Sequence, residues 1–246
     1  EQQAAKKECE DKGQRWKPSL RNITLGEAWT RLTGMCLKGQ NMPAIQAASG
    51  PGMQMCLGEK NGMEQMQHML FRSLEANSKL GAFVGDIQNG FPSQSREHIY
   101  MELLRNPALA PLIPYFRTFY LDCPLPIYIY GQDSSEPIRT MWSEEGTRQG
   151  DPLAPPFWCI GYAYVLRWIK NQGGLPLAWM DDTTILCTPE VCTQILRSIR
   201  GVLGASGLIM DLGNSKKNHY LLPADPGIAP PVLPTGVQLQ MVNHIK

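Results

Sequence analysis

Apolar side chains recur at helical spacing in several stretches of the chain. Residues 25–39 carry apolar positions three or four residues apart, which predicts a helix that ends at Gly39. The next residues, 41–62, are rich in glycine and proline, so we expect a loop there. Further helices are expected at 62–77, at 95–106 with Ser95 as its cap, at 156–170 and at 191–207.

Short apolar runs predict the strands. Residues 80–87 are expected to form a buried strand that ends near Asp86, and residues 126–131 a strand rich in tyrosine and isoleucine. Residues 175–187 place two apolar arms around an aspartate pair, the pattern of a β-hairpin with carboxylates at its tip. A polar loop is expected over 141–155. Long crossovers between the strands predict a mixed α/β or α+β domain.

Composition narrows the classes of protein that the chain can be. Its 246 residues are 43% hydrophobic and 18% charged, below the roughly 25% charged residues of an average globular protein, which argues against a disordered charged tail. The formal net charge is +1. Any binding of nucleic acid must therefore use local basic patches rather than overall charge.

The cysteines and the apolar runs indicate a compartment. Seven cysteines are present, an odd number without any C-x-x-C pair, which fits neither a disulfide framework nor a zinc knuckle and suggests a reducing environment. The first 16 residues hold no apolar signal-peptide core, and the apolar run 157–169 is short and contains Arg167. We therefore expect a soluble intracellular protein without membrane contact, in the nucleus, the cytoplasm or an organelle.

Three aspartates stand out as candidates for chemistry. Asp86 ends an apolar strand, while Asp181 and Asp182 lie between the arms of the hairpin, where neighbouring side chains point to opposite faces. Carboxylates held close together repel each other unless a cation lies between them, and hard oxygen ligands favour Mg²⁺ or Mn²⁺ over zinc. The alternative for the hairpin taken alone is a pair of solvated turn aspartates.

The run TRQGDPLAP, residues 147–155, is the most specific motif in the chain. It lies within the second of four segments, which cover residues 84–96, 144–158, 177–186 and 206–218. In this order the four segments resemble motifs A, B, C and D of reverse transcriptases, the RNA-directed DNA polymerases, and in particular the branch that includes non-LTR retrotransposons and group II introns. Residues 21–32 resemble the fingers motif of the same family, and residues 234–239 the beginning of its motif E.

This resemblance implies an α+β fold, the fingers and palm of a right-hand polymerase, in which helices flank an antiparallel palm sheet. The thumb is expected to be absent or truncated. The expected parts are an N-terminal extension (1–20), a fingers-like region (21–80), a palm with motifs A to D (81–222) and a C-terminal segment (223–246).

The resemblance also implies a metal site and a reaction. Asp86, Asp181 and Asp182, together with the Ile87 carbonyl, are expected to hold Mg²⁺ or Mn²⁺. The ions would align a DNA primer 3′-hydroxyl, paired to an RNA template, with the α-phosphate of an incoming dNTP. The expected cofactor is therefore Mg²⁺ or Mn²⁺, and the expected partners are RNA template, DNA primer and dNTP.

Other positions match residues that contact the nucleotide. Phe91 matches a steric gate that selects dNTP over rNTP, and its alternative is an ordinary core phenylalanine. Arg21 matches an arginine that binds the triphosphate. Lys216 would protonate the leaving pyrophosphate, and Lys217 is the neighbouring candidate for this role. For each of these three residues, the alternative is an ordinary surface side chain without a role in the reaction. Residues expected beside the nascent base pair are Arg148, Gln149 and Gly150.

Departures from the motifs keep other functions open. Four positions differ from the residues that are usual in these motifs. Asn22 replaces proline, Gly90 replaces alanine, Trp179 replaces tyrosine or phenylalanine, and Asp211 replaces asparagine. These departures, with the low charge, favour a second hypothesis, an inactive retroelement-derived domain that serves as a structural or binding component with protein partners. A third hypothesis, an RNA-dependent RNA polymerase, is disfavoured by Phe91 and by the absence of glycine before the aspartate pair.

Overall fold

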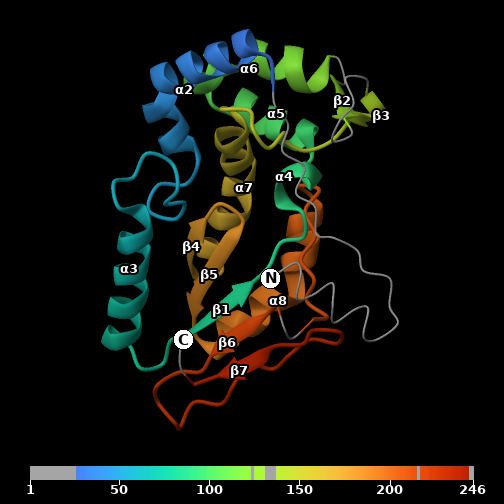
Figure 1. Cartoon of the computed structure of the whole chain (residues 1–246). Helices are drawn as coiled ribbons and strands as arrows, with labels where there is room; N and C mark the ends of the chain where they lie inside the picture. The colour runs from blue at the N-terminus through green and yellow to red at the C-terminus, as the bar shows by residue number, and fades with distance from the viewer. Residues whose placement is uncertain (1–25, 123–124, 131–136, 215–216, 244–246) are drawn as a thin grey trace.

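A five-stranded sheet occupies one end of the molecule (Figure 1). The computed structural model describes residues 26–122, 125–130, 137–214 and 217–243. The strand order is β4-β5-β1-β6-β7, and each neighbouring pair is antiparallel except β6 with β7. The bounds are β1 Gly81–Gly85, β4 Leu175–Trp179, β5 Asp182–Cys187, β6 His219–Leu221 and β7 Gln240–Val242.

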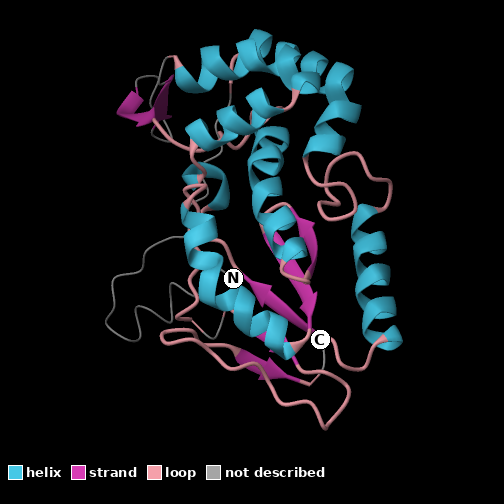
Figure 2. Ribbon diagram, turned by 180° about the vertical axis from the view of Figure 1, so that it is seen from behind, coloured by secondary structure: helices cyan, strands magenta, loops and turns pink. Residues whose placement is uncertain are grey.

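Alternate side chains of the central strands enter two separate apolar clusters, as the pleat of a strand requires. Phe83 and Ile185 join the main core with helices α7 (Ala154–Asn171) and α8 (Pro189–Gly204). Ala82 and Leu186 join a smaller cluster with helix α3 (Gly62–Ala76). Figure 2 shows α8 lying across the sheet. The sheet is thus covered by helices on both faces.

The other end of the molecule is a group of helices around the start of α7 (Figure 1). The buried aromatic side chains of α7, Phe157 and Trp158, belong to the same main core as Phe116. A two-stranded ribbon, β2 with β3, lies beside these helices. The elements are α2 Ala28–Ala48, α4 Gly90–Ser93, α5 Arg96–Arg105, η1 Pro107–Leu112, α6 Ile113–Phe116, η2 Arg117–Leu121, β2 Leu125–Tyr130 and β3 Pro137–Ser143.

Most expected elements are confirmed, and two expectations were wrong. Helix α2 continues past Gly39 and through Pro43 to Ala48. Burial of Ile45, which has no exposed surface, outweighs the poor helix propensity of glycine and proline. The polar loop expected over 141–155 is also shorter, because its first residues complete β3 and pair with β2.

The architecture is α+β, with a mostly antiparallel sheet flanked by helices, as the sequence predicts. Within the described ranges, no helix is both long and apolar enough to span a membrane. Ser95 caps α5 as expected, since its hydroxyl accepts a hydrogen bond from the amide of His98.

Candidate active site

The pairing of β1 with β5 brings distant aspartates to one end of the sheet. Gly85 pairs with Thr183 in the antiparallel register, so Asp86 follows β1 where β5 begins. Asp182 is the first residue of β5, and Asp181 lies in the turn before it. The two segments meet because β1 and β5 are neighbouring, mostly buried strands in the interior of the sheet.

Asp181 faces the segment that follows Asp86. A Cβ atom built on Gly90 would lie 3.2 Å from the Asp181 Cβ and 3.5 Å from its Oδ2. An alanine at this position would press against the carboxylate-bearing side chain. Asp182 is exposed, whereas Ile87 is buried and its backbone bridges to Met210. The glycine that departs from the usual motif is therefore the residue that makes room for Asp181.

Asp86 is bound by a lysine from the chain segment before β6. Lys217 Nζ donates a hydrogen bond of 2.6 Å to Asp86 Oδ2, and the two side chains are exposed by 46% and 41%, respectively. The hydrogen bond and the charge of Asp86 raise the pKa of Lys217. The protonated form of Lys217 that the ion pair requires is therefore fully present below the ordinary pKa of lysine and is lost as the pH rises through the raised value. Lys216 lies outside the described residues, as does Arg21.

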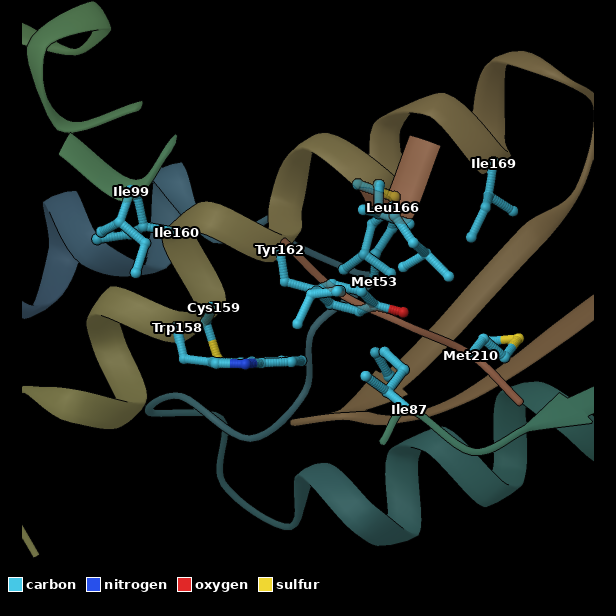
Figure 3. Close-up of a cluster of buried hydrophobic side chains, with 14 of the residues drawn as sticks. Met53, Ile87, Ile99, Trp158, Cys159, Ile160, Tyr162, Leu166, Ile169 and Met210 are labelled. Carbon is cyan, nitrogen blue, oxygen red and sulfur yellow. The ribbon is translucent and has the colours of Figure 1, made fainter. Parts of the chain in front are cut away.

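Phe91 is anchored in an aromatic stack beneath the hairpin. Its ring stacks on Trp158 with centroids 5.6 Å apart and planes inclined by 17°, and Trp158 stacks on Tyr162 at 4.7 Å. Tyr162 shares a hydrogen bond of 2.9 Å with Thr183 at the start of β5. Figure 3 shows Trp158 and Tyr162 on α7. The stack links the half-buried Phe91 to the strand that carries Asp182.

The loop over 144–150 is fixed to the segment around Phe91. Thr147 donates its amide to the Phe91 carbonyl at 2.7 Å, and Gly146 donates to Gln94 at 3.1 Å. Gly150 has φ of 110°, a backbone conformation that favours glycine, and it is exposed beside the half-buried Gln149. The loop predicted to lie beside the base pair therefore adjoins the predicted gate.

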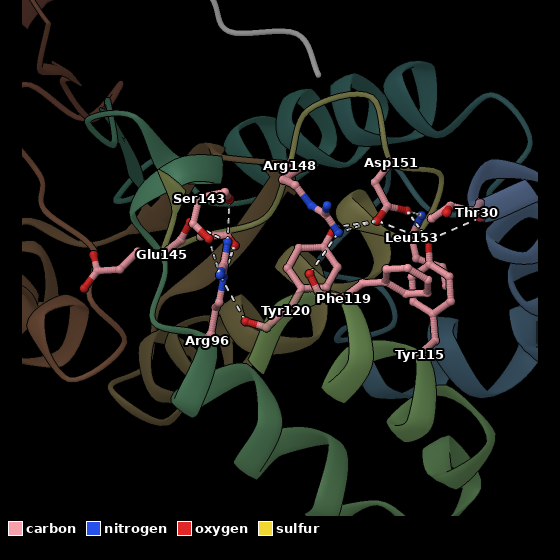
Figure 4. A network of polar contacts seen from close by, with 11 residues as sticks. Thr30, Arg96, Tyr115, Phe119, Tyr120, Ser143, Glu145, Arg148, Asp151 and Leu153 are labelled. Atoms are coloured by element: carbon pink, nitrogen blue, oxygen red, sulfur yellow. Dashed lines mark hydrogen bonds and ion pairs between the residues drawn. The ribbon is translucent and has the colours of Figure 1, made fainter. Parts of the chain in front are cut away.

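Arg148 points into the protein rather than outward. Its guanidinium lies over the Tyr120 ring at 4.6 Å and donates to the Phe119 carbonyl at 3.0 Å (Figure 4). The side chain is 11% exposed and lies 3.9 Å from Asp151. It also lines a small pocket at the start of α2, next to Arg31. Its contact with a nucleotide stays a prediction.

Asp151 organises the start of α7. It accepts hydrogen bonds from the Tyr120 hydroxyl at 2.6 Å, from the Tyr115 hydroxyl at 3.2 Å and from the Leu153 amide at 2.8 Å. Burial, with the Asp151 charge beside them, raises the pKa of both tyrosines. The aspartate of the R-Q-G-D-P-L run thus joins α7 to the helices around it.

Arg96 is a site-supporting residue that the sequence did not single out. It is 6% exposed and donates to the carbonyls of Gly146 (2.9 Å), Tyr120 (3.0 Å) and Ser143 (2.6 Å), and to Glu145 (3.2 Å). Burial, with the nearby charge of Arg148, lowers its pKa to about 10. Figure 4 shows Arg96 among these carbonyls. The only signal in the sequence is its place at the end of the motif A segment.

Gln54 holds the turn that precedes Asp181. Its Oε1 accepts from the Met180 amide at 2.9 Å, and its Nε2 donates to the Met180 carbonyl at 3.2 Å. Met180 has φ of 57°, an uncommon conformation for a residue with a side chain. The Gln54 backbone also bridges in parallel to Ala178. Nothing in the sequence marked Gln54, because it lies in a stretch expected to be a simple loop.

Replacing Gln54 by Leu should loosen this turn. The variant leaves both backbone groups of Met180 without their side-chain partner, at a cost of about 1–3 kcal/mol in the free energy of unfolding. We also expect faster hydrogen exchange at the Met180 amide, measured by NMR. The matched control is Gln194→Leu on the exposed side of α8, which should leave the exchange unchanged. Equal exchange at Met180 in the parent and in Gln54→Leu would contradict this role.

No family model and no curated protein sequence matches the chain. Among solved structures, the fold is that of reverse-transcriptase-related polymerases. One is the apo telomerase from Candida tropicalis truncated from its C-terminal domain, at TM-score 0.53 and 12% identity over 78% of this chain and 40% of that one. Another is the Candida tropicalis telomerase in complex with a TWJ fragment of telomeric RNA, at TM-score 0.53 and 12% identity over 82% and 35% of the two chains.

The likeness establishes the fold class. The chain has a reverse-transcriptase-like polymerase fold and spans less than half the length of these telomerases. Within the described part of the chain, no group of three or more His, Cys, Asp and Glu side chains is gathered closely enough to hold a metal ion. The sequence correctly predicts the fold class, while the roles of the individual site residues stay predictions.

Proposed function

We propose that the chain is the core of an RNA-directed DNA polymerase of the non-LTR and group II intron-like branch. The observation that carries the proposal is the β1–β5 register, which brings Asp86 and the Asp181–Asp182 turn to one end of the sheet. The RNA-bound Candida tropicalis telomerase, which shares the fold, supports RNA as a partner. The substrates would be an RNA template, a DNA primer and dNTP.

The donor set fits Mg²⁺. This ion is usually bound through one or two carboxylates, with water and substrate phosphates as the other ligands, so a cluster of three carboxylates is not required. Asp86 and Asp181 would supply the carboxylates, with Asp182 and the Ile87 carbonyl beside them. When bound, the metal ion would activate the primer hydroxyl and neutralise phosphate charge.

The remaining residues would position the substrates. Phe91, fixed by its stack on Trp158, would lie against the sugar and exclude a 2′-hydroxyl. The loop with Gln149 and Gly150 would approach the nascent base pair. Lys216 or Lys217 would donate a proton to the leaving pyrophosphate, and the contact of Lys217 with Asp86 supports Lys217.

Primer extension tests the proposal. Protein mixed with poly(rA), oligo(dT), dTTP and Mg²⁺ or Mn²⁺ should lengthen the primer, and it should use dTTP in preference to UTP. Circular dichroism on the same sample establishes that the protein is folded. The absence of extension by folded protein, with either metal ion, would overturn the assignment as a polymerase.

A second candidate function is that of a binding component in a larger assembly. Helix α2 exposes Trp29 by 78%, Leu32 by 47% and Met35 by 54%, an apolar surface suited to a protein partner. The ion pair of Asp86 with Lys217 also engages one carboxylate of the proposed metal site. Folded protein without polymerase activity would favour this function.

Replacing Lys217 by Met separates metal binding from proton donation. The ammonium and a metal ion compete for the same carboxylate oxygen, so Mn²⁺ should bind up to about fivefold more tightly, given that an exposed ion pair contributes about 1 kcal/mol or less. Primer extension should slow by about 10²-fold if the lysine donates a proton. Electron paramagnetic resonance measures free Mn²⁺, with the exposed Lys79→Met as control. Weaker Mn²⁺ binding by Lys217→Met would contradict the competition.

A further inference from the structure

Three sulfur atoms meet directly beneath the turn that carries Asp181. Cys56 Sγ lies 3.6 Å from Cys159 Sγ and 3.3 Å from Met180 Sδ, while Cys159 Sγ lies 3.8 Å from Met180 Sδ. The three residues come from separate parts of the fold, namely the loop between α2 and α3, helix α7 and the β4–β5 turn. The sulfurs form a nearly equilateral triangle.

The size of this triangle suits a single metal ion. A point equidistant from the three sulfurs lies about 2.1 Å from each, close to the roughly 2.3 Å of a zinc–thiolate bond. Two thiols and a thioether are soft ligands, which select Cu(I). A structural zinc site usually has four nitrogen or sulfur ligands, so a set of three that includes a thioether does not favour zinc.

The surroundings allow an ion to reach the three sulfur atoms. Cys159 is buried, but Cys56 is only partly buried and gives access from the loop side. The hydrogen bond with Cys159 lowers the pKa of Cys56, whereas burial raises the pKa of Cys159 well above that of an ordinary thiol. A metal ion that binds here must therefore displace the Cys159 proton. The backbone of Met180 is also held by its two hydrogen bonds with Gln54, which lies on the same loop as Cys56.

We propose that Cys56, Cys159 and Met180 form a binding site for Cu(I). Both thiols lose their protons to solvent on binding, so one Cu⁺ with two thiolates and the thioether gives a complex with net charge −1. Because Met180 precedes Asp181, the bound ion would tie the turn to α7 and to the loop over 49–61. The site is separate from the carboxylates proposed to hold Mg²⁺.

Anaerobic titration of the reduced full chain with Cu(I), in competition with bicinchoninate, tests the site. We expect one tightly held ion, with X-ray absorption showing coordination by sulfur alone. Met180→Leu and Cys56→Ser should each weaken Cu(I) binding at least about 100-fold. Replacing a residue that only supports a metal ligand already weakens binding by up to about 100-fold, and these variants remove a ligand itself. Met180→Leu is the sharper variant, since it removes the thioether and keeps every thiol and nearly the same volume.

Two further variants separate this site from copper held by other thiols. Cys36→Ser, on the exposed side of α2, and Cys192→Ser, in α8, should keep the tightly bound ion. Unchanged affinity in Met180→Leu and Cys56→Ser would overturn the proposal, and so would loss of the ion in either control. The readout is metal affinity, so it does not depend on polymerase activity.

Discussion

Replacing Asp181 by Asn will abolish primer extension and leave the fold intact. The carboxylate is proposed to hold the metal ion that polarises the reacting groups, and an amide of the same size cannot supply its charge. The loss should be at least about 10²–10³-fold, the effect of removing one preorganised electrostatic group. Asparagine still fits beside Gly90, because the space around the side chain is unchanged. The measurement is the rate of dTTP incorporation on poly(rA)/oligo(dT).

The control for this result is Asp225→Asn, at a turn after β6 where asparagine can still accept the hydrogen bond from the Gly227 amide. This variant should extend primers at the parental rate. A second comparison is Mn²⁺ binding, which Asp181→Asn should weaken and Asp225→Asn should not. Full activity of Asp181→Asn would exclude the proposed role of the hairpin, whatever the activity of the other variants.

Replacing Arg96 by Met will destabilise the protein more than any surface substitution. The guanidinium donates to four backbone carbonyls and to the Ser143 hydroxyl, and all of these are left without their charged donor in the variant. We expect the free energy of unfolding to fall by about 3–5 kcal/mol. Urea denaturation followed by circular dichroism measures this change as a lower midpoint.

Two substitutions test whether the geometry of Arg96 causes this effect. Arg96→Lys keeps the charge but loses the planar group that reaches several carbonyls at once, so it should recover less than half of the lost stability. Arg197→Met, on the exposed side of α8, should change stability by about 0.5 kcal/mol or less. If the urea midpoint of Arg96→Met equals that of Arg197→Met, the carbonyls that Arg96 contacts find other hydrogen-bond donors, and the proposed role of Arg96 is wrong.

The parts of the fold that the sequence predicts are those set by local patterns. Helices α3 and α7, strand β1 and the β4–β5 hairpin each carry a periodic or uninterrupted apolar pattern, and each lies close to its predicted place. Strand β3 was missed because its residues are partly polar and depend on pairing with β2. Helix α2 was cut short because Gly39 and Pro43 gave a stop signal that burial of Ile45 overrides.

The residues of the candidate site also fall into those that the sequence predicts and those that it does not. Asp86, Asp181 and the loop over 144–150 could be predicted, because each lies in a recognisable run of residues. Arg96 and Gln54 could not, because their partners are backbone groups distant in sequence, which leave no pattern of side chains. The contact of Lys217 with Asp86 likewise depends on how the chain enters β6, and adjacent lysines are equivalent in the sequence alone.

The two-sided packing of the central strands has a consequence for insertions and deletions. Phe83 and Ile185 enter one apolar cluster, while Ala82 and Leu186 enter the other. A shift of β5 by one residue would exchange these sets and move the aspartate turn along β1 by the length of one residue, about 3.3 Å. The same apolar residues that stabilise the sheet therefore fix the register of β5 on β1, and with it the distance between Asp86 and Asp181. Chains that differ by one residue within β1 or β5 should be eliminated by selection on folding before selection on activity can act.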